Sequence, residues 1–173
     1  MPSTLTSLEH YLRYPGEYEP DADYVDGEIE LRPMGEYDHA TWQSAIHSWF
    51  NQRAKQWNIR VRLELRVQVS PTRYRIPDAV VWDRSRPTEQ ILTYPPIAVF
   101  EVLSPEDRMS RMKIKLADYE AMGIRTIRAI EPKSGTISRF EQGVLKPIAS
   151  LVEQLPDTPC ILDWIKIQEL LDD

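Results

Sequence analysis

The sequence predicts a mixed α/β (α+β) fold in which a β-sheet of several strands is flanked by helices. Three observations support this fold class. Residues 60–69 alternate polar and apolar side chains, which is the period of a β-strand. Short apolar runs of strand length follow at 75–82 and 97–103. After the second run, a helix over 105–122 would lead to another strand at 125–131, the length expected for a right-handed crossover between parallel strands.

Length and composition fit a single domain that spans residues 1–173. The chain has 173 residues, 42% of them hydrophobic, and can bury one core. It has no apolar run long enough for a membrane span, and its N-terminus lacks the basic and apolar regions of a secretory signal. We therefore expect a cytoplasmic protein that does not enter a membrane. Cys160 is the single cysteine, which excludes an intrachain disulfide and predicts a buried thiol.

The first third of the chain should contain a short helix, a hairpin and a longer helix. Thr6-Ser7-Leu8-Glu9 has capping-box spacing, so a short helix should form there and end near Pro15. Asp26-Gly27 lies between two short alternating runs and predicts a tight hairpin or a strand entered through a turn. Asp38 can cap a helix over residues 39–57. The apolar residues that would form the packing face of this helix are Trp42, Ile46, Trp49, Phe50 and Trp57.

The clearest strand, 60–69, has one polar face that is rich in arginine. This face would meet solvent, the charged face of a helix or a bound polyanion. Downstream, Ser104-Pro105 supplies an N-cap residue and a first-turn proline for a helix that Gly123 ends. The remaining expected elements are a strand at 126–130, a hairpin of 136–140 and 144–148 that turns at Gln142-Gly143, and a closing helix at 163–171.

Charge is unevenly distributed along the chain. The net charge is −6, yet residues 51–86 hold nine Lys or Arg against three acidic residues. A second basic cluster follows the apolar run at 97–103, where it could meet phosphates. The alternative is that these residues form solvated faces that balance acidic ones. The candidates for contact with nucleic acid are Arg62, Arg66, Arg73, Arg75, Arg108, Arg111 and Lys113.

Two of the apolar strands each carry one carboxylate, Asp78 and Glu101. A charged group on a buried strand is costly to desolvate unless it is paired or binds a metal. Alternation places Glu101 on the same face as Val99 and Leu103, so its carboxylate projects from an otherwise apolar face of the strand. Mg²⁺ is typically held by one or two carboxylates and waters, and it supports phosphodiester hydrolysis. Alternatively, Asp78 is a strand-entry residue after Pro77, and Glu101 pairs with a nearby arginine.

A lysine near the attacking water would stabilise hydroxide and the charge that develops on phosphorus. The helix after the second strand offers Lys113 and Lys115. With Met112, Leu116 and Tyr119 as the buried stripe, Lys115 lies about 60° to one side of Met112 and Lys113 about 100° to the other, so Lys115 is better placed to bend inward. The alternative for Lys115 is a flank position from which it reaches solvent.

These residues together resemble a known family. The segments that carry the resemblance are Asp26-Gly27-Glu28, His39, Pro77-Asp78, Glu101-Val102-Leu103-Ser104-Pro105, Lys115, Tyr119 and Gly123. They are similar to the Uma-type restriction endonuclease family of the PD-(D/E)XK nuclease superfamily, over a region from about Tyr24 to Pro132. One departure is the run Ile127–Pro132, which carries Arg128 and Glu131 where the family often ends its strand with Val-Asp-Pro.

The resemblance implies a restriction-endonuclease-like fold and roles for individual residues. Asp78, Glu101 and the carbonyl of Val102 would bind Mg²⁺, with Mn²⁺ as a substitute, and Lys115 would be the displaced lysine of the superfamily motif. The superfamily also uses an early carboxylate, for which Glu28 is favoured over Glu30. His39 would orient a water or a phosphate; the alternative is that it is simply a polar residue in the first turn of a helix.

The expected function is therefore that of a Mg²⁺-dependent DNA endonuclease. Cutting both strands would favour a homodimer, whose two-fold axis matches the symmetry of a duplex. Two alternatives stay open. One is a catalytically silent nucleic-acid-binding module with the same fold. The other is a metal-free glycoside hydrolase that uses Asp78 and Glu101 as acid and base, which would leave Lys115 unexplained.

Overall fold

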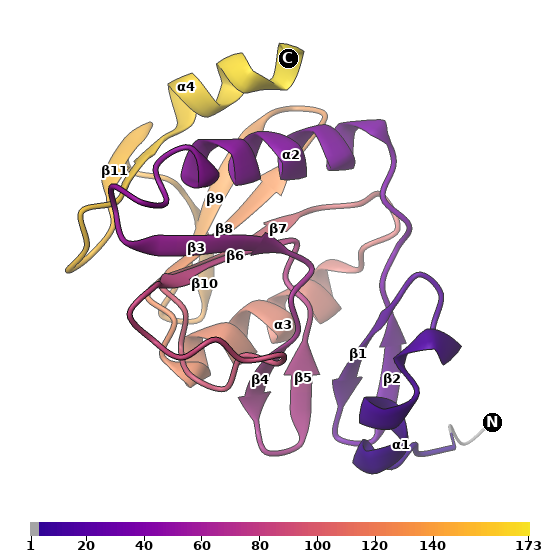
Figure 1. Ribbon diagram of the computed structural model, residues 1–173. Helices are drawn as coiled ribbons and strands as arrows, with labels where there is room; N and C mark the ends of the chain where they lie inside the picture. The colour runs from indigo at the N-terminus through magenta and orange to yellow at the C-terminus, as the bar shows by residue number, and fades with distance from the viewer. Residues whose placement is uncertain (1–3) are drawn as a thin grey trace.

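A computed structural model describes residues 4–173 and has a six-stranded sheet at its centre. The strand order is β10-β9-β8-β7-β6-β3. These strands are β3 (Ile59–Leu63), β6 (Ala79–Asp83), β7 (Ala98–Val102), β8 (Thr126–Glu131), β9 (Thr136–Glu141) and β10 (Val144–Pro147). Helix α2 (Tyr37–Asn51) covers one face and α3 (Met109–Met122) the other (Figure 1). The predicted mixed sheet with flanking helices is confirmed.

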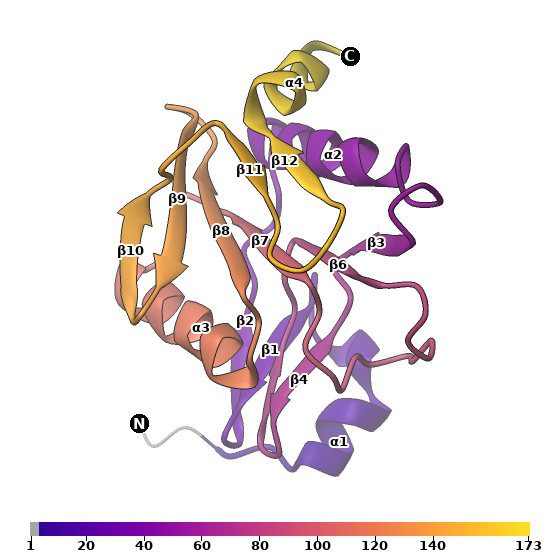
Figure 2. The same ribbon diagram turned by 90° about the vertical axis from the view of Figure 1, so that its left-hand side faces the viewer.

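A second, four-stranded sheet lies at the end of the molecule away from the C-terminal helix (Figure 2). Its strand order is β2-β1-β5-β4. The strands are β1 (Ala22–Val25), β2 (Glu28–Leu31), β4 (Val67–Ser70) and β5 (Arg73–Arg75), with α1 (Leu8–Arg13) beside them. The C-terminal part forms the small hairpin β11 (Val152–Gln154) and β12 (Ile161–Asp163), then α4 (Trp164–Glu169). No helix within residues 4–173 is long and apolar enough to cross a membrane.

Several local predictions are confirmed. Strands β7 and β8 are parallel and are connected through α3, which ends at Gly123 with a left-handed φ of 102°. Asp26-Gly27 and Gln142-Gly143 form hairpin turns in which all four residues have positive φ. Such turns match the twist of the strands that they connect.

The predicted strand over 60–69 is wrong in its extent, because it divides between the two sheets. Strand β3 ends at Leu63, Glu64 has a left-handed φ of 55°, and β4 begins at Val67. The run at 75–82 divides similarly, since β5 ends at Arg75 and β6 begins at Ala79. An alternating pattern does not reveal which sheet a strand joins. The break leaves Asp78 at the junction of the two sheets.

The helix boundaries differ from the predictions by a few residues. Helix α3 begins at Met109 and not at Ser104-Pro105, because residues 104–107 form a turn in which the Ser104 N–H donates to the Asp107 carboxylate at 2.6 Å. Helix α2 covers Tyr37–Asn51, shorter than 39–57 at its C-terminal end, and Asp38 lies in its first turn. The expected helix over 163–171 is capped by Asp163, but α4 gives way to a 3₁₀ turn at Leu170–Asp172.

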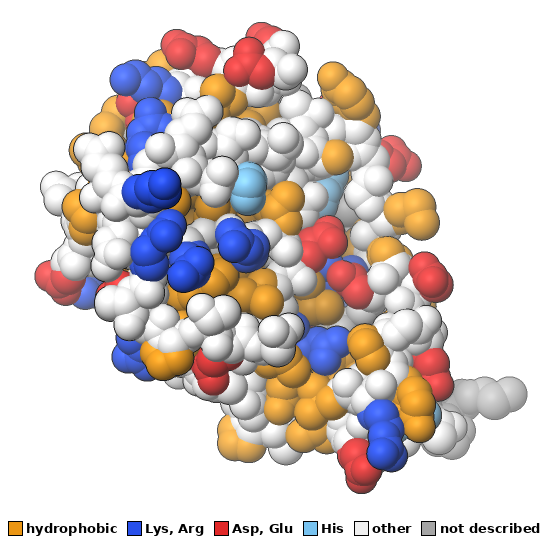
Figure 3. Space-filling model, in the orientation of Figure 1, with side chains coloured by type: hydrophobic (Ala, Val, Ile, Leu, Met, Phe, Trp, Pro, Cys, Tyr) orange, Lys and Arg blue, Asp and Glu red, His pale blue; other side chains and the backbone are white. Residues whose placement is uncertain are grey.

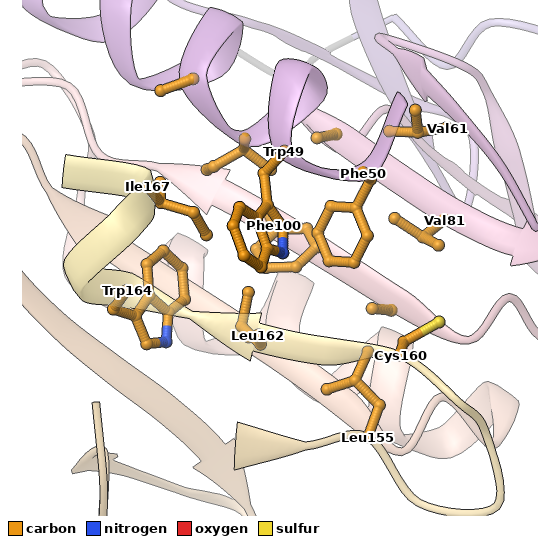
Figure 4. Packing of buried hydrophobic residues seen from close by; sticks show 14 of the residues in the cluster. Trp49, Phe50, Val61, Val81, Phe100, Leu155, Cys160, Leu162, Trp164 and Ile167 are labelled. Atoms are coloured by element: carbon orange, nitrogen blue, oxygen red, sulfur yellow. The ribbon is translucent and has the colours of Figure 1, made fainter. Parts of the chain in front are cut away.

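The larger core packs α2 and α4 against the six-stranded sheet (Figure 4). Phe100 of β7 lies between Phe50 of α2 and Trp164 of α4, with ring centroids 5.6 Å and 6.1 Å away. Cys160 is fully buried in this core, as predicted. Because every second residue of β7 packs here, Glu101 faces the opposite side, toward α3.

Candidate active site

Asp78, Glu101 and Lys115 meet around one buried cavity at the junction of the sheets. Antiparallel pairing of Ala79 with Phe100 places Asp78 beside Glu101, and α3 brings Lys115 to both. The three residues are 2%, 2% and 8% exposed. The cavity has a volume of about 30 Å³. A single water needs about 10 to 15 Å³ on this measure, so the space suits a small ion with a water.

Three donors from the chain surround the carboxylate of Asp78. The Val102 N–H donates to Oδ2 at 2.6 Å, and Arg32 Nη2 donates to Oδ1 at 2.7 Å. His39 Nε2 lies 3.2 Å from the same Oδ1. Burial alone would raise the pKa of Asp78, but the His39 contact and the charge of Arg32 outweigh it and hold the pKa below its ordinary value. Asp78 is therefore ionised.

The pKa of Glu101 is shifted in the opposite direction from that of Asp78. Its Oε1 accepts a hydrogen bond from the Tyr119 hydroxyl at 2.6 Å and lies 3.0 Å from Lys115 Nζ. Burial raises its pKa to about 7, although the charge of Lys115 opposes the rise, and the negative charge of Asp78 adds to it. The two neighbouring carboxyl groups thus differ in their affinity for a proton, a common property of functional sites.

Lys115 is held as a cation by its surroundings. Its Nζ donates to the Ile76 carbonyl at 3.0 Å and lies 3.4 Å from Asp23 Oδ2. Burial would lower the pKa of Lys115, but the charges of Asp23 and Glu101 raise it above its ordinary value. Met112, Leu116 and Tyr119 are buried on the same helix, so the predicted stripe and the inward course of Lys115 are both observed.

Arg32 and Asp23 are site residues that the sequence reasoning missed. Arg32 follows β2 and bridges Asp21 and Asp78. Asp23 lies in β1, all four residues of which are buried, and it accepts from the Ile76 N–H at 2.9 Å. The signal that could have revealed Asp23 is the one used for Asp78, a lone acid in a short apolar strand. For Arg32 the signal was weaker, an arginine in a strongly acidic segment.

The structure does not bring Glu28 to the cavity. Glu28 is an exposed residue at the start of β2, paired with Val25 across the hairpin. Glu28 and Glu30 lie on the same face of β2, but Glu28 is beside the hairpin turn, whereas Glu30, two residues further along the strand, contacts Arg75 at 2.8 Å. The early carboxylate that reaches Lys115 is Asp23. His39, in contrast, does line the cavity.

Two of the seven residues predicted to contact nucleic acid form ion pairs with carboxylates of the chain itself. Arg75 is fully buried, and its guanidinium donates to Asp118 at 2.7 Å and to Glu30 and Asp23. Arg73 pairs with Asp26 and Asp118. Their charges are neutralised within the fold, because acids distant in sequence converge on β5. These two arginines are therefore unsuited to binding phosphate.

The other five predicted residues have no ion-pair partner within the described part of the chain. They are Arg62, Arg66, Arg108, Arg111 and Lys113. Arg108 and Arg111 line a cleft of about 160 Å³ that adjoins the cavity and shares Arg32 and Lys115 with it. Basic side chains also gather over β3 (Figure 3), the strand that carries Arg60 and Arg62.

The donor set at the cavity fits a divalent cation. No group of three or more His, Cys, Asp or Glu side chains suited to a metal occurs among residues 4–173. Mg²⁺ does not need one, because one or two carboxylates with waters are usual. Asp78 and Glu101 supply these carboxylates, and Val102 lines the same cavity.

Comparisons with known proteins identify a family and a solved structure that the chain resembles. The family model Uma2, described as "Putative restriction endonuclease", matches residues 8–168. A crystal structure of a putative nuclease of the DUF820 group from Anabaena variabilis is similar over 95% of this chain and 98% of that chain, with a TM-score of 0.80 and 25% sequence identity. No curated protein matches the chain.

Proposed function

The chain belongs to the Uma2 restriction endonuclease family, and from this premise we propose that it is a divalent-metal-dependent nuclease that hydrolyses phosphodiester bonds of DNA. The observation that carries the proposal is the convergence of Asp78, Glu101 and Lys115 on one buried cavity. Two carboxylates beside a fixed cation can hold a metal ion and offset charge on a phosphate. The nuclease description of the solved neighbour supports the same reading.

The carboxylates of Asp78 and Glu101, with the carbonyl of Val102, would hold Mg²⁺, for which Mn²⁺ can substitute. When bound, the ion lowers the pKa of a coordinated water and offsets charge on the scissile phosphate. Glu101 must lose its proton to serve as a ligand. Tyr119 fixes the orientation of the Glu101 carboxylate through its hydroxyl.

Lys115 would act as a fixed cation beside the attacking water. Because its pKa is raised, it stays charged and stabilises hydroxide and the charge developing on the phosphate, without itself removing a proton. His39 would be a positioning residue, since its Nε2 contacts Asp78 Oδ1.

Two groups of basic residues would contact the nucleic-acid backbone. The first group is Arg108, Arg111 and Lys113, around the cleft that adjoins the cavity. The second is Arg62 and Arg66, on either side of the turn between β3 and β4. This turn is close to the site, since the Glu64 N–H donates to the Asp78 carbonyl at 3.3 Å. Arginines without carboxylate partners are available to phosphates, and such contacts make binding dependent on salt.

A homodimer is part of the proposal, because a two-fold axis would bring one site to each strand of a duplex. Light scattering of the purified chain, with and without duplex DNA, tests it. A monomer in both conditions would limit each encounter to a single cut.

The proposal is tested by cleavage of supercoiled plasmid and of single-stranded oligonucleotides in Mg²⁺, Mn²⁺ or chelator. Asp78→Asn, which preserves side-chain shape, and Glu101→Ala should abolish cleavage, whereas Glu169→Ala, at an exposed site on α4, should not. Unchanged cleavage in the first two variants would refute the assignment. Binding without cleavage by the wild type would favour the silent binding module. Sugar hydrolysis that persists in chelator would favour the glycoside hydrolase.

A further inference from the structure

Arg32 links two carboxylates through different nitrogens of one guanidinium group. Its Nη1 donates to Asp21 Oδ2 and its Nη2 donates to Asp78 Oδ1, each at 2.7 Å. The Arg32 side chain is 11% exposed, and that of Asp78 is 3% exposed. A guanidinium is charged at every accessible pH, so this is a permanent cation at the proposed metal site.

The hydrogen bonds of Asp78 leave little room for a metal ligand bond on Oδ1. A carboxylate has about four lone-pair positions, two on each oxygen. Two nitrogens of the chain, Arg32 Nη2 and His39 Nε2, already contact Oδ1, while Oδ2 accepts from the Val102 N–H. The Val102 N–H belongs to the backbone of β7, and His39 can be neutral. Arg32 is therefore the group whose charge conflicts with a divalent ion at Oδ1.

We propose that Arg32 is an exchangeable cation that holds the place of the metal ion at Asp78 and, once displaced, binds the substrate phosphate. The inference rests on the proposed nuclease function. When the ion binds Asp78, Nη2 leaves Oδ1 while Nη1 stays on Asp21, so the arginine moves without losing its anchor. Arg32 lines both the cavity and the adjoining cleft, so the freed N–H groups face the path of the substrate.

Lys115 is not displaced in the same way. Its Nζ contacts Glu101 and Asp23 and donates to the Ile76 carbonyl, so its position does not depend on Asp78. The two cations thus differ in role. Lys115 also contacts a proposed metal ligand, Glu101, but it keeps two other partners, Asp23 and the Ile76 carbonyl, whereas Arg32 keeps one, Asp21.

Calorimetric titration of the metal-free full-length chain with Mn²⁺ tests the competition. Arg32→Leu should bind Mn²⁺ at least about ten-fold more tightly than the wild type, within the usual range of coupling between two sites. Arg125→Leu, which removes the same charge from an exposed position, should change the affinity less than about two-fold. A folded Arg32→Leu variant with unchanged or weaker affinity would overturn the proposal.

Crystal structures of the wild type with and without Mn²⁺ give a second test that needs no variant. The contact between Arg32 Nη2 and Asp78 Oδ1 should open from 2.7 Å to more than about 3.5 Å, beyond hydrogen-bond reach. An intact contact beside a bound ion would overturn the exchange. Mn²⁺ binding that survives Asp78→Asn unchanged would overturn the metal site and with it the proposed function, which separates the two failures.

The phosphate role is tested with a fluorescent oligonucleotide and Ca²⁺ in place of Mg²⁺. With Ca²⁺ present, Arg32→Leu should weaken binding about ten-fold, the effect of losing one charge-assisted hydrogen bond. Without metal the loss should be smaller, because Nη2 of the wild type is then engaged by Asp78. Equal losses in the two conditions would overturn this part of the proposal.

Discussion

The metal-free protein should lose stability as the pH rises from 5 to 8, because of Glu101. Burial raises the pKa of this carboxyl from an ordinary 4.5 to about 7, so the folded chain retains a proton that the unfolded chain releases. The stabilising effect is complete below pH 4.5 and disappears as the pH passes 7. One pKa unit corresponds to about 1.4 kcal/mol, so the full effect is about 3.5 kcal/mol, of which about 2.5 kcal/mol should be lost between pH 5 and pH 8.

Urea unfolding followed by tryptophan fluorescence in chelator, at several pH values, measures this effect. The informative comparison is between the wild type and Glu101→Gln, which has no titratable group at this position. His39 also has a raised pKa, because its contact with Asp78 outweighs burial, and it contributes a loss of the same sign. His39 is present in both proteins, so its contribution cancels in the difference between them except for the part due to the Glu101 charge, a weaker cause of its raised pKa than the Asp78 contact. Glu169→Gln, at an exposed site, serves as the matched control.

The stability difference between wild type and Glu101→Gln should therefore change by about 2.5 kcal/mol between pH 5 and pH 8. If the free energies of unfolding of the two proteins change in parallel with pH over this range, the reasoning is refuted. Saturating Mn²⁺ gives a further check, because a metal ligand must be deprotonated. Adding the ion should flatten or reverse the pH dependence of the wild type and leave that of Glu101→Gln nearly unchanged.

Three other outcomes are expected. Arg75→Met should lower the free energy of unfolding by about 3 to 5 kcal/mol in urea, because three carboxylates lose their buried partner, and a loss below about 1 kcal/mol would contradict this. Arg62→Gln should leave stability within about 0.5 kcal/mol. It should also weaken DNA binding and reduce the slope of affinity against salt by about one; an unchanged slope would remove Arg62 from the interface. Lys115→Met should slow cleavage by about 100-fold or more while Mn²⁺ still binds, and near-normal rates would exclude an electrostatic role for Lys115.

The central residues of the candidate site were predictable because short-range patterns determine them. Alternation in the strand indicated the face of Glu101, and the apolar stripe on the helix indicated that Lys115, not Lys113, turns inward. Both are properties of a few consecutive residues, and the structure shows both. The hairpin turns were predictable for the same reason, since a glycine beside a polar residue favours positive φ.

The remaining features depend on contacts between distant segments. Alternation continues through Glu64, so no local pattern indicates that the strand changes sheets there. Arg75 resembled a free phosphate ligand because its three acidic partners lie 43 to 52 residues away. Arg32 was missed for a similar reason, since its contact with Asp78 spans 46 residues. The charges of neighbouring residues in the sequence cannot show which distant residues will pair and neutralise each other.

The division of the site between two sheets has a consequence for how such proteins can diverge. Glu101 and Lys115 belong to the large sheet and its helix, whereas Asp23 and Arg32 come from the N-terminal hairpin, which lies outside the larger core. A substitution at Arg32 can therefore alter the charge around Asp78 without touching the larger core, whereas a substitution at Asp23 also removes a partner of Arg75 and Lys115. Under the proposed function, homologues with other residues at the position of Arg32 would differ in metal affinity while they keep the same core.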